Sequence, residues 1–144
     1  MHAARGFPLS VAATVWLSCF APVASDDGRA PVTATTVCDL IRRPASFDSQ
    51  VVSVFATIKP AAHYTMTISD PQCGDQTIAL LIPSKLDGTV DVEKLRSAVL
   101  AGYPRPSSRQ IRARLTGEFH SRPGEVPSRL FSLRSVADIE TKSE

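Results

Sequence analysis

Beyond residue 25, this 144-residue chain has four cysteine and histidine side chains that could ligate a metal: Cys38, Cys73, His63 and His120. A zinc site needs three or four ligands that converge at about 2.0–2.3 Å from the metal. None of the four residues stands in a CxxC, HxH or HExxH spacing, which would bring ligands together within one short segment. The spacing therefore predicts exposed histidines, with neither a metal site nor another cofactor.

The two cysteines fit a disulfide better than a metal site. An even number of cysteines in a small exported domain is typical of a structural disulfide. A Cys38–Cys73 bridge would close a loop of about 35 residues and stabilise the domain by about 3–4 kcal/mol in the chain-entropy model. A small domain has a marginal core, so such a bridge would matter to its stability. A metal site and a reactive thiol are the alternatives for this pair.

The start of the chain has the order of charge and hydropathy that is found in secretory signals. Arg5 is followed by an uncharged apolar run over residues 7–20, and small residues then lead to Ser25. The run of about 14 residues is too short for a membrane core that needs roughly 20. We therefore expect residues 1–25 to be a cleaved signal peptide. The mature protein would be exported to the periplasm or the exterior, without a transmembrane span.

Cys19 offers a second interpretation of the same segment. A bacterial lipoprotein signal ends at a lipidated cysteine that follows a small residue, and Ser18 meets that condition. Trp16, however, stands where such signals have an aliphatic residue, and a conventional cleavage site follows. A lipid anchor at Cys19 is therefore the less favoured alternative.

The segment before the first strand divides into a leader and a short helix. Residues 26–35 are rich in polar and turn-forming residues, which predicts a flexible leader. Thr36 and Asp39 then form the pattern of a capping box. We expect a helix over residues 37–42 that ends at Pro44, because proline cannot continue a helix.

Five segments show the period-two alternation of β-strands, and one shows a helical period. The helix, over residues 91–101, stands between the third and fourth strands and would have Asp91 as its N-cap. We expect a bulge where the alternation fails at Leu130 and Phe131, and a frayed tail over residues 140–144. The predicted strands cover residues 50–59, 63–69, 77–82, 109–119 and 128–139.

Three strands in a meander, a helix and two further strands is the element order of the OB fold, a small Greek-key barrel. The helix would close one end of the barrel, which explains why only one of its faces is apolar. The sequence therefore predicts one mainly β domain over residues 36–139. This domain would be a five-stranded OB-type Greek-key barrel with that helix and a short N-terminal helix.

Several short motifs stand at informative spacings between residues 36 and 139: Val37–Leu40, Phe47, Val51–Val54, His63, Asp70–Cys73 and Leu115–Phe119. They resemble a loosely defined group of small bacterial exported or lipoprotein-type OB-fold proteins. The resemblance implies the barrel and the extracytoplasmic compartment, but it assigns no activity and no site residue. Ala56 departs from the group, whose barrels often bend at a glycine there.

The residues do not favour an enzyme. Serine and aspartate are plentiful, but no serine stands in a GxSxG elbow or beside a suitable base. Residues 74–77 have some similarity to the acidic calcium-binding turn of exported OB-fold nucleases. The further carboxylates and arginines of those enzymes are not recognisable in this chain. We therefore predict a non-catalytic domain, with a metal-dependent hydrolase as an alternative.

Nucleic-acid binding is common among OB barrels, and it needs a basic groove with aromatic side chains for stacking. Arg112 and Arg114 would project from the outer face of the fourth strand, and Arg122 and Arg129 would flank the next loop. Most aromatic residues, however, are at predicted core positions. If Arg5 leaves with the signal, the chain's 16 Lys and Arg and 14 Asp and Glu residues give a net charge of +1. Such a charge provides no bulk attraction to nucleic acid. We expect the arginines to pair with Glu118 and Glu125, which leaves single-strand binding as a further alternative.

OB barrels recognise oligosaccharides and proteins through strands two and three and the adjoining loops. By this analogy, we predict a non-catalytic interaction module whose partner is a protein or an envelope polymer. A competing interpretation places Tyr64 and Met66 in the core. The predicted ligand surface comprises His63, Tyr64, Met66, Arg112, Arg114, His120 and Arg122.

Overall fold

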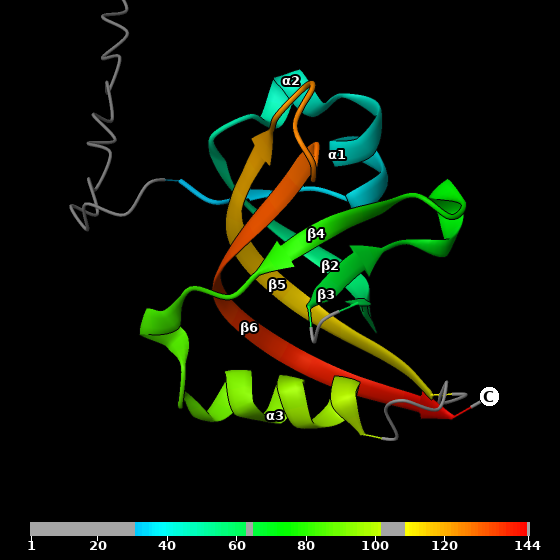
Figure 1. The fold of residues 1–144 in the computed structure, drawn as a ribbon, viewed down its shortest axis with the longest axis vertical. Coiled ribbons are helices and arrows are strands. Elements are labelled where there is room, and N and C mark those ends of the chain that lie inside the picture. The colour runs from blue at the N-terminus through cyan, green and yellow to red at the C-terminus, as the bar shows by residue number, and fades with distance from the viewer. Residues whose placement is uncertain (1–30, 63–64, 102–108, 144) are drawn as a thin grey trace, which may run out of the picture.

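The computed structural model describes residues 31–62, 65–101 and 109–143, and the protein is mainly β (Figure 1). Short helices lie at one end of the sheet and the longest helix lies at the other end. The elements are β1 (Thr33–Ala34), α1 (Val37–Arg42), α2 (Pro44–Phe47), β2 (Gln50–Pro60), β3 (Met66–Ser69), η2 (Pro71–Cys73), β4 (Thr77–Leu81), η3 (Ser84–Leu86), α3 (Val90–Leu100), β5 (Arg109–Ser121) and β6 (Arg129–Ser143).

Five of the strands close into a mixed barrel. β2 pairs antiparallel with β3, β3 with β4 and β5 with β6, whereas β4 and β6 run parallel. The pairing of β2 with β5, from Gln50 opposite Phe119 to Ile58 opposite Ile111, closes the circle. This strand order, with the helix between the third and fourth barrel strands, is that of the OB barrel. The predicted fold is therefore confirmed.

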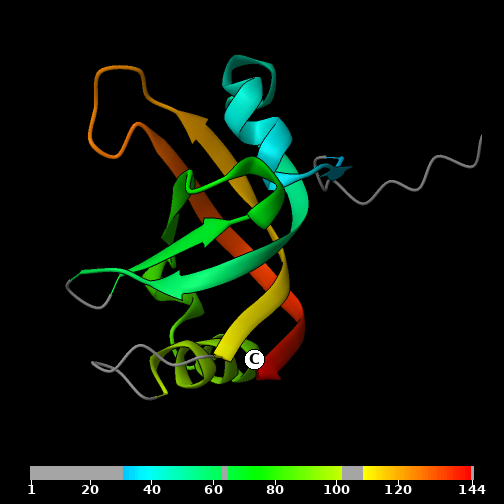
Figure 2. The same cartoon turned by 90° about the vertical axis from the view of Figure 1, so that its right-hand side faces the viewer.

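The core follows from the alternation of the strands. Along β2, the side chains that point into the barrel are at most 2% exposed. α3 closes the barrel end with one apolar face, as predicted, and buries Val92, Leu95 and Val99 (Figure 2). Burial of each large apolar side chain stabilises the fold by about 1.5–3 kcal/mol. The largest fully buried side chains include Phe119, Phe131, Leu40, Ile68, Ile78, Leu95, Leu115 and Leu133.

Thr36 caps α1 as predicted, but the second bond of the capping box differs, because the Asp39 carboxylate accepts from the Thr36 hydroxyl and not from its backbone N–H. The Asp39 N–H donates to Thr36 Oγ1 at 3.0 Å, and the Thr36 hydroxyl donates to the Asp39 carboxylate at 2.9 Å. The hydrogen bonds from Thr36 and from Arg43, at 3.0 Å, hold the pKa of Asp39 below its usual value. Pro44 ends α1 as expected, but it also begins α2, because proline suits the first turn of a helix.

The helix α3 begins one residue earlier than predicted. Its N-cap is Thr89, whose side chain makes no capping hydrogen bond, and Asp91 lies within the first turn. A carboxylate in the first turn interacts favourably with the helix dipole, so Asp91 stabilises the N-terminus of α3 although it is not the N-cap. No helix within the described residues is long and apolar enough to cross a membrane.

The end of the predicted leader is part of the sheet. Thr33 and Ala34 form β1, which runs parallel to β2 with Thr33 opposite Val52. The N–H of Thr35 continues this pairing by donating to the Ser53 carbonyl at 3.0 Å. Two residues are too few to show an alternation, so the sequence pattern could not predict this strand. The first five residues of the leader, 26–30, lie outside the described residues.

The last strand is longer than predicted. β6 continues to Ser143 because β5 begins at Arg109 and gives residues 140–143 an antiparallel partner. The prediction of a frayed tail is therefore wrong for these four residues. The register shifts also lie elsewhere than expected: they occur at Arg134 and at Asp138, where φ is 50°.

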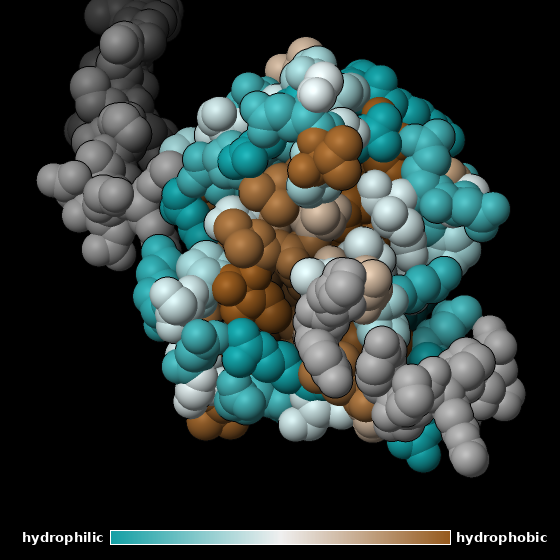
Figure 3. Space-filling view, viewed as in Figure 1, coloured by the Kyte–Doolittle hydropathy of each residue, from teal (hydrophilic) through white to brown (hydrophobic). Residues whose placement is uncertain are grey.

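The apolar–polar alternation of β6 fails at Leu130 because an apolar residue lies on the outer face of the strand, and not because of a bulge. Phe131 points into the barrel and is fully buried, so Leu130 points outward, where it is half-buried. Its partner on β4 is Ala79, and Leu81 on the same face of β4 is 46% exposed. Apolar side chains accordingly gather on this side of the molecule (Figure 3).

Candidate ligand-binding groove

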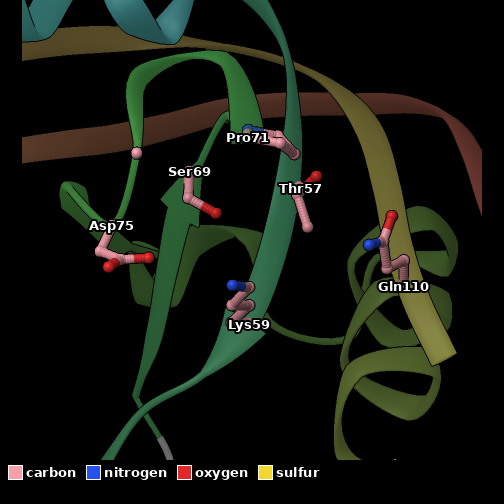
Figure 4. Close-up of a pocket in the computed structure, with 7 residues that line it drawn as sticks. Thr57, Lys59, Ser69, Pro71, Asp75 and Gln110 are labelled. Carbon is pink, nitrogen blue, oxygen red and sulfur yellow. The ribbon is translucent and has the colours of Figure 1, made fainter. Parts of the chain in front are cut away.

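A groove with a volume of about 280 Å³ runs over the outer face of β2 (Figure 4). Figure 4 shows Lys59 between Ser69 and Asp75 on one side of the groove and Gln110 on the other. The volume is close to the lower end of the range for small-molecule sites. The lining residues are Thr57, Lys59, Ser69, Pro71, Gly74, Asp75 and Gln110.

The strand pairing brings the floor of the groove together. Alternate residues of a strand share one face, so Thr57 and Lys59 both point out of the barrel. Thr57 stands opposite Ser69 of β3 and also opposite Arg112 of β5. These pairs make a polar cross-strand row at the place where β2 leaves β5 and begins to pair with β3.

One wall of the groove is the connection between β3 and β4. Its turn is fixed locally, because Asp70 caps η2 by accepting a hydrogen bond from the Gln72 N–H at 2.9 Å. Gly74 follows with φ at 73°, a left-handed conformation that favours glycine. The connection is also fixed to the rest of the domain by the disulfide between Cys73 and Cys38 of α1, with Cα atoms 5.4 Å apart. The predicted disulfide is therefore present, and its two sulfurs are not free to bind a metal.

The groove keeps two opposite charges that are not neutralised. Lys59 and Asp75 are both exposed, and neither makes an ion pair with any described residue. Elsewhere in the described chain, facing charges do pair: Arg96 lies 2.6 Å from Asp87, for example. Lys59 and Asp75 therefore offer a cation and an anion on separate parts of one groove.

The Thr57 hydroxyl has no hydrogen-bond partner among the described residues. The side chain is 4% exposed, and Oγ1 is closed off from solvent. Most buried polar groups in proteins are hydrogen-bonded, because leaving one unpaired costs about 1–3 kcal/mol. The unpaired Thr57 hydroxyl lowers the stability of the fold, so its presence in the lining of the groove is not explained by folding.

The Thr57→Val variant is expected to unfold with a free energy about 1 kcal/mol higher than that of the wild type. Valine keeps the shape of threonine and removes the unpaired hydroxyl. Urea titration followed by circular dichroism measures the difference. Thr67→Val is the matched control on β3, since Thr67 is only half-buried, and its effect should stay within about 0.5 kcal/mol. A less stable Thr57→Val protein would show that the hydroxyl has a partner after all.

Arg112 and Arg114 project outward from β5, as predicted, but they do not form a free cationic surface. Both guanidinium groups lie against the ring of Phe55, at 4.6 Å and 6.0 Å from its centroid. Arg114 also makes an ion pair with Asp138 at 2.8 Å. The two guanidinium groups thus already cover the face of the Phe55 ring, which disfavours stacking of a base on this ring.

The predicted pairing of the arginines with Glu118 and Glu125 is confirmed for Arg122, which contacts Glu125 at 3.4 Å in the connection between β5 and β6. Glu118 is instead contacted by Arg134 at 2.9 Å. The prediction is therefore wrong for Arg112 and Arg114. Cross-strand register decides the partners, and it could not be derived from the alternation alone.

The rest of the predicted ligand surface does not come together. Met66 is 5% exposed and belongs to the core, so its inclusion in the surface is wrong and the competing interpretation is right for this residue. His120 is half-buried, 3.7 Å from Glu118, at the opposite end of β5 from Gln110. His63 and Tyr64 lie outside the described residues.

None of the described residues that line the groove belongs to the predicted ligand surface. Most of the lining comes from the outward face of the first barrel strand and from the turn-rich segment after the second strand, and Ser69 and Gln110 of two further strands complete it. The signals were present, since Thr57 and Lys59 alternate with the core and Asp75 lies in the turn. What could not be predicted was that these two segments lie side by side. Within the described residues, no three histidine, cysteine or acidic side chains are grouped to hold a metal ion.

Comparisons with known proteins add no assignment. The chain matches no family model, and no curated protein is significantly similar to it. The resemblance to small exported OB-fold proteins therefore stays a prediction, and the function has to be argued from the groove.

Proposed function

We propose that this protein is a non-catalytic binding module that acts outside the cytoplasm and holds a protein or an envelope polymer in the groove over β2. The observation that carries the proposal is the groove itself. A disulfide-tethered turn forms one of its walls, and Lys59 and Asp75 in its lining make no ion pair with any described residue. A backbone that is already held in place lowers the entropic cost of binding a ligand.

The extracytoplasmic location is supported by two independent features. The disulfide between Cys38 and Cys73 is of a kind that persists in oxidising compartments. Residues 1–25 have the charge and hydropathy order of a secretory signal. The two features agree, because structural disulfides are rare in the reducing cytoplasm.

Binding is favoured over catalysis by the chemistry of the lining. The buried Thr57 hydroxyl makes no hydrogen bond to a base among the described residues. Asp75 is the one carboxylate among the described lining residues, whereas metal-dependent hydrolysis uses several ligands on one ion. These groups can donate and accept hydrogen bonds, which is what recognition requires.

The test is an NMR titration of ¹⁵N-labelled protein, purified after expression of the full chain, with solubilised peptidoglycan fragments and with a soluble envelope polysaccharide. We expect one of these probes to shift the amide signals of Thr57, Lys59, Ser69 and Gln110, with the signals of β6 unchanged. Mass spectrometry should recover that probe unaltered. Conversion of a probe, or shifts confined to other faces with every probe, would overturn the proposal.

A further inference from the structure

The charges of the groove restrict the ligand that it can take. An anion would be attracted by Lys59 but repelled by Asp75, and a cation would meet the opposite arrangement. Neither side chain is neutralised by a described neighbour, so neither repulsion is relieved within the protein. A ligand with both a positive and a negative group can satisfy the two charges at once.

The size of the groove sets a second limit. The groove volume of about 280 Å³ is close to the lower end of the range for small-molecule sites, so the groove suits a small ligand or a short unit of a larger one. A dipeptide has this size, whereas a long polymer would fit only through one of its end groups or short units.

The other polar groups of the lining set a third limit. Ser69 and Gln110 line the groove with a hydroxyl and an amide, and an amide can both donate and accept hydrogen bonds. A peptide bond presents one donor and one acceptor, which these side chains could match. Pro71 adds apolar surface at the disulfide-tethered wall.

We infer that the groove over β2 binds a short zwitterionic unit of amino-acid or dipeptide type, whose carboxylate faces Lys59 and whose ammonium group faces Asp75. The inference rests on the proposed function, because it names the chemical class of ligand for the same groove. A free peptide end or a peptide unit of an envelope polymer would present these groups. The two charges make the site selective, because each of them contacts the group of opposite charge on the ligand.

Four peptides that differ only in their end charges test the inference. They are Ala-Ala, N-acetyl-Ala-Ala, Ala-Ala amide and N-acetyl-Ala-Ala amide, each titrated into the ¹⁵N-labelled protein. We expect Ala-Ala to bind most tightly and to shift the amide signals of Lys59, Ser69 and Asp75. Loss of either end charge should weaken binding by about three- to tenfold, since charged hydrogen bonds at a partly exposed site have this strength.

Two variants assign each end of the ligand. Lys59→Gln should abolish the difference between Ala-Ala and Ala-Ala amide and keep the effect of N-acetylation. Asp75→Asn should do the reverse. Both residues are exposed, so neither change is expected to impair folding. Lys85→Gln and Asp91→Asn are controls with the same charge changes away from the groove, and they should leave all four affinities unchanged.

The outcomes separate the inference from the proposed function. Equal binding of all four peptides in the groove would overturn the charge selectivity and leave the groove as a binding site. Shifts of groove signals by the polysaccharide alone would likewise overturn the peptide class while the binding function stands. If neither the peptides nor the larger probes shift any groove signal, the proposed function fails and the inference fails with it.

Discussion

The Gly117→Ala variant is expected to be less stable than the wild type by about 2–3 kcal/mol. Gly117 lies on the inward face of β5, where the pairing register between β5 and β6 shifts. A Cβ atom there would lie 2.5 Å from Cε1 of Phe131 and would also clash with the backbone carbonyl of Ser132. The ring is fully buried and the carbonyl belongs to the paired strand, so neither can move away cheaply. Overpacking of this kind typically costs 1–3 kcal/mol.

Urea unfolding of the two proteins measures the difference. Thr116→Ala is the matched control, because Thr116 is the neighbour on β5 whose half-buried side chain points outward. We expect the control to change the free energy of unfolding by less than about 1 kcal/mol. If the Gly117→Ala protein were as stable as the control, β5 and β6 could separate locally without a loss of stability. That result would contradict the tight packing of the barrel.

Removal of the disulfide is expected to have the second large effect. The Cys38→Ala/Cys73→Ala variant should lose about 3–4 kcal/mol of unfolding free energy, because the bridge spans 35 positions of the chain and restricts the unfolded state. Chemical reduction of the wild type should lower its stability by a similar amount. The same reductant should have no effect on the double variant, which serves as the control.

The disulfide variant should also bind more weakly in the groove. Cys73 ends η2, directly before Gly74 and Asp75 of the groove wall, and its bridge to α1 ties this turn to the domain. Without the bridge, the turn would have more conformations, and binding would have to restrict them. Titration with Ala-Ala under conditions in which the variant is fully folded checks this expectation. Equal affinities would show that the turn is held by its own Asp70 cap and not by the disulfide.

The sequence by itself determined the elements and their order. Alternation in the first strand reports burial on one face, so Val52, Val54 and Ala56 could be assigned to the core. The N-terminal helix could be predicted from Thr36 and Asp39, since a capping box acts within one turn. The disulfide could be predicted because two cysteines in a domain with a predicted secretory signal leave few alternatives. All three features depend on interactions between residues close in the sequence or on the amino-acid composition.

The candidate site could not be predicted, because it depends on contacts between distant segments. Whether Arg114 meets a glutamate or Asp138 is decided by the register between β5 and β6, which two bulges change along the strands. Met66 alternates as regularly as an exposed strand residue would, and only the closed barrel shows that its face is inside.

The tertiary structure alone decided where the groove lies and what charges it holds. Lys59 and Asp75 are separated by a strand and a turn in the sequence, and they line one groove because β3 folds back onto β2 and the disulfide holds the next turn beside it. The sequence determined which residues are polar and outward. Barrel closure then determined which of them become neighbours, because side chains from three strands share an outer face only after the strands pair.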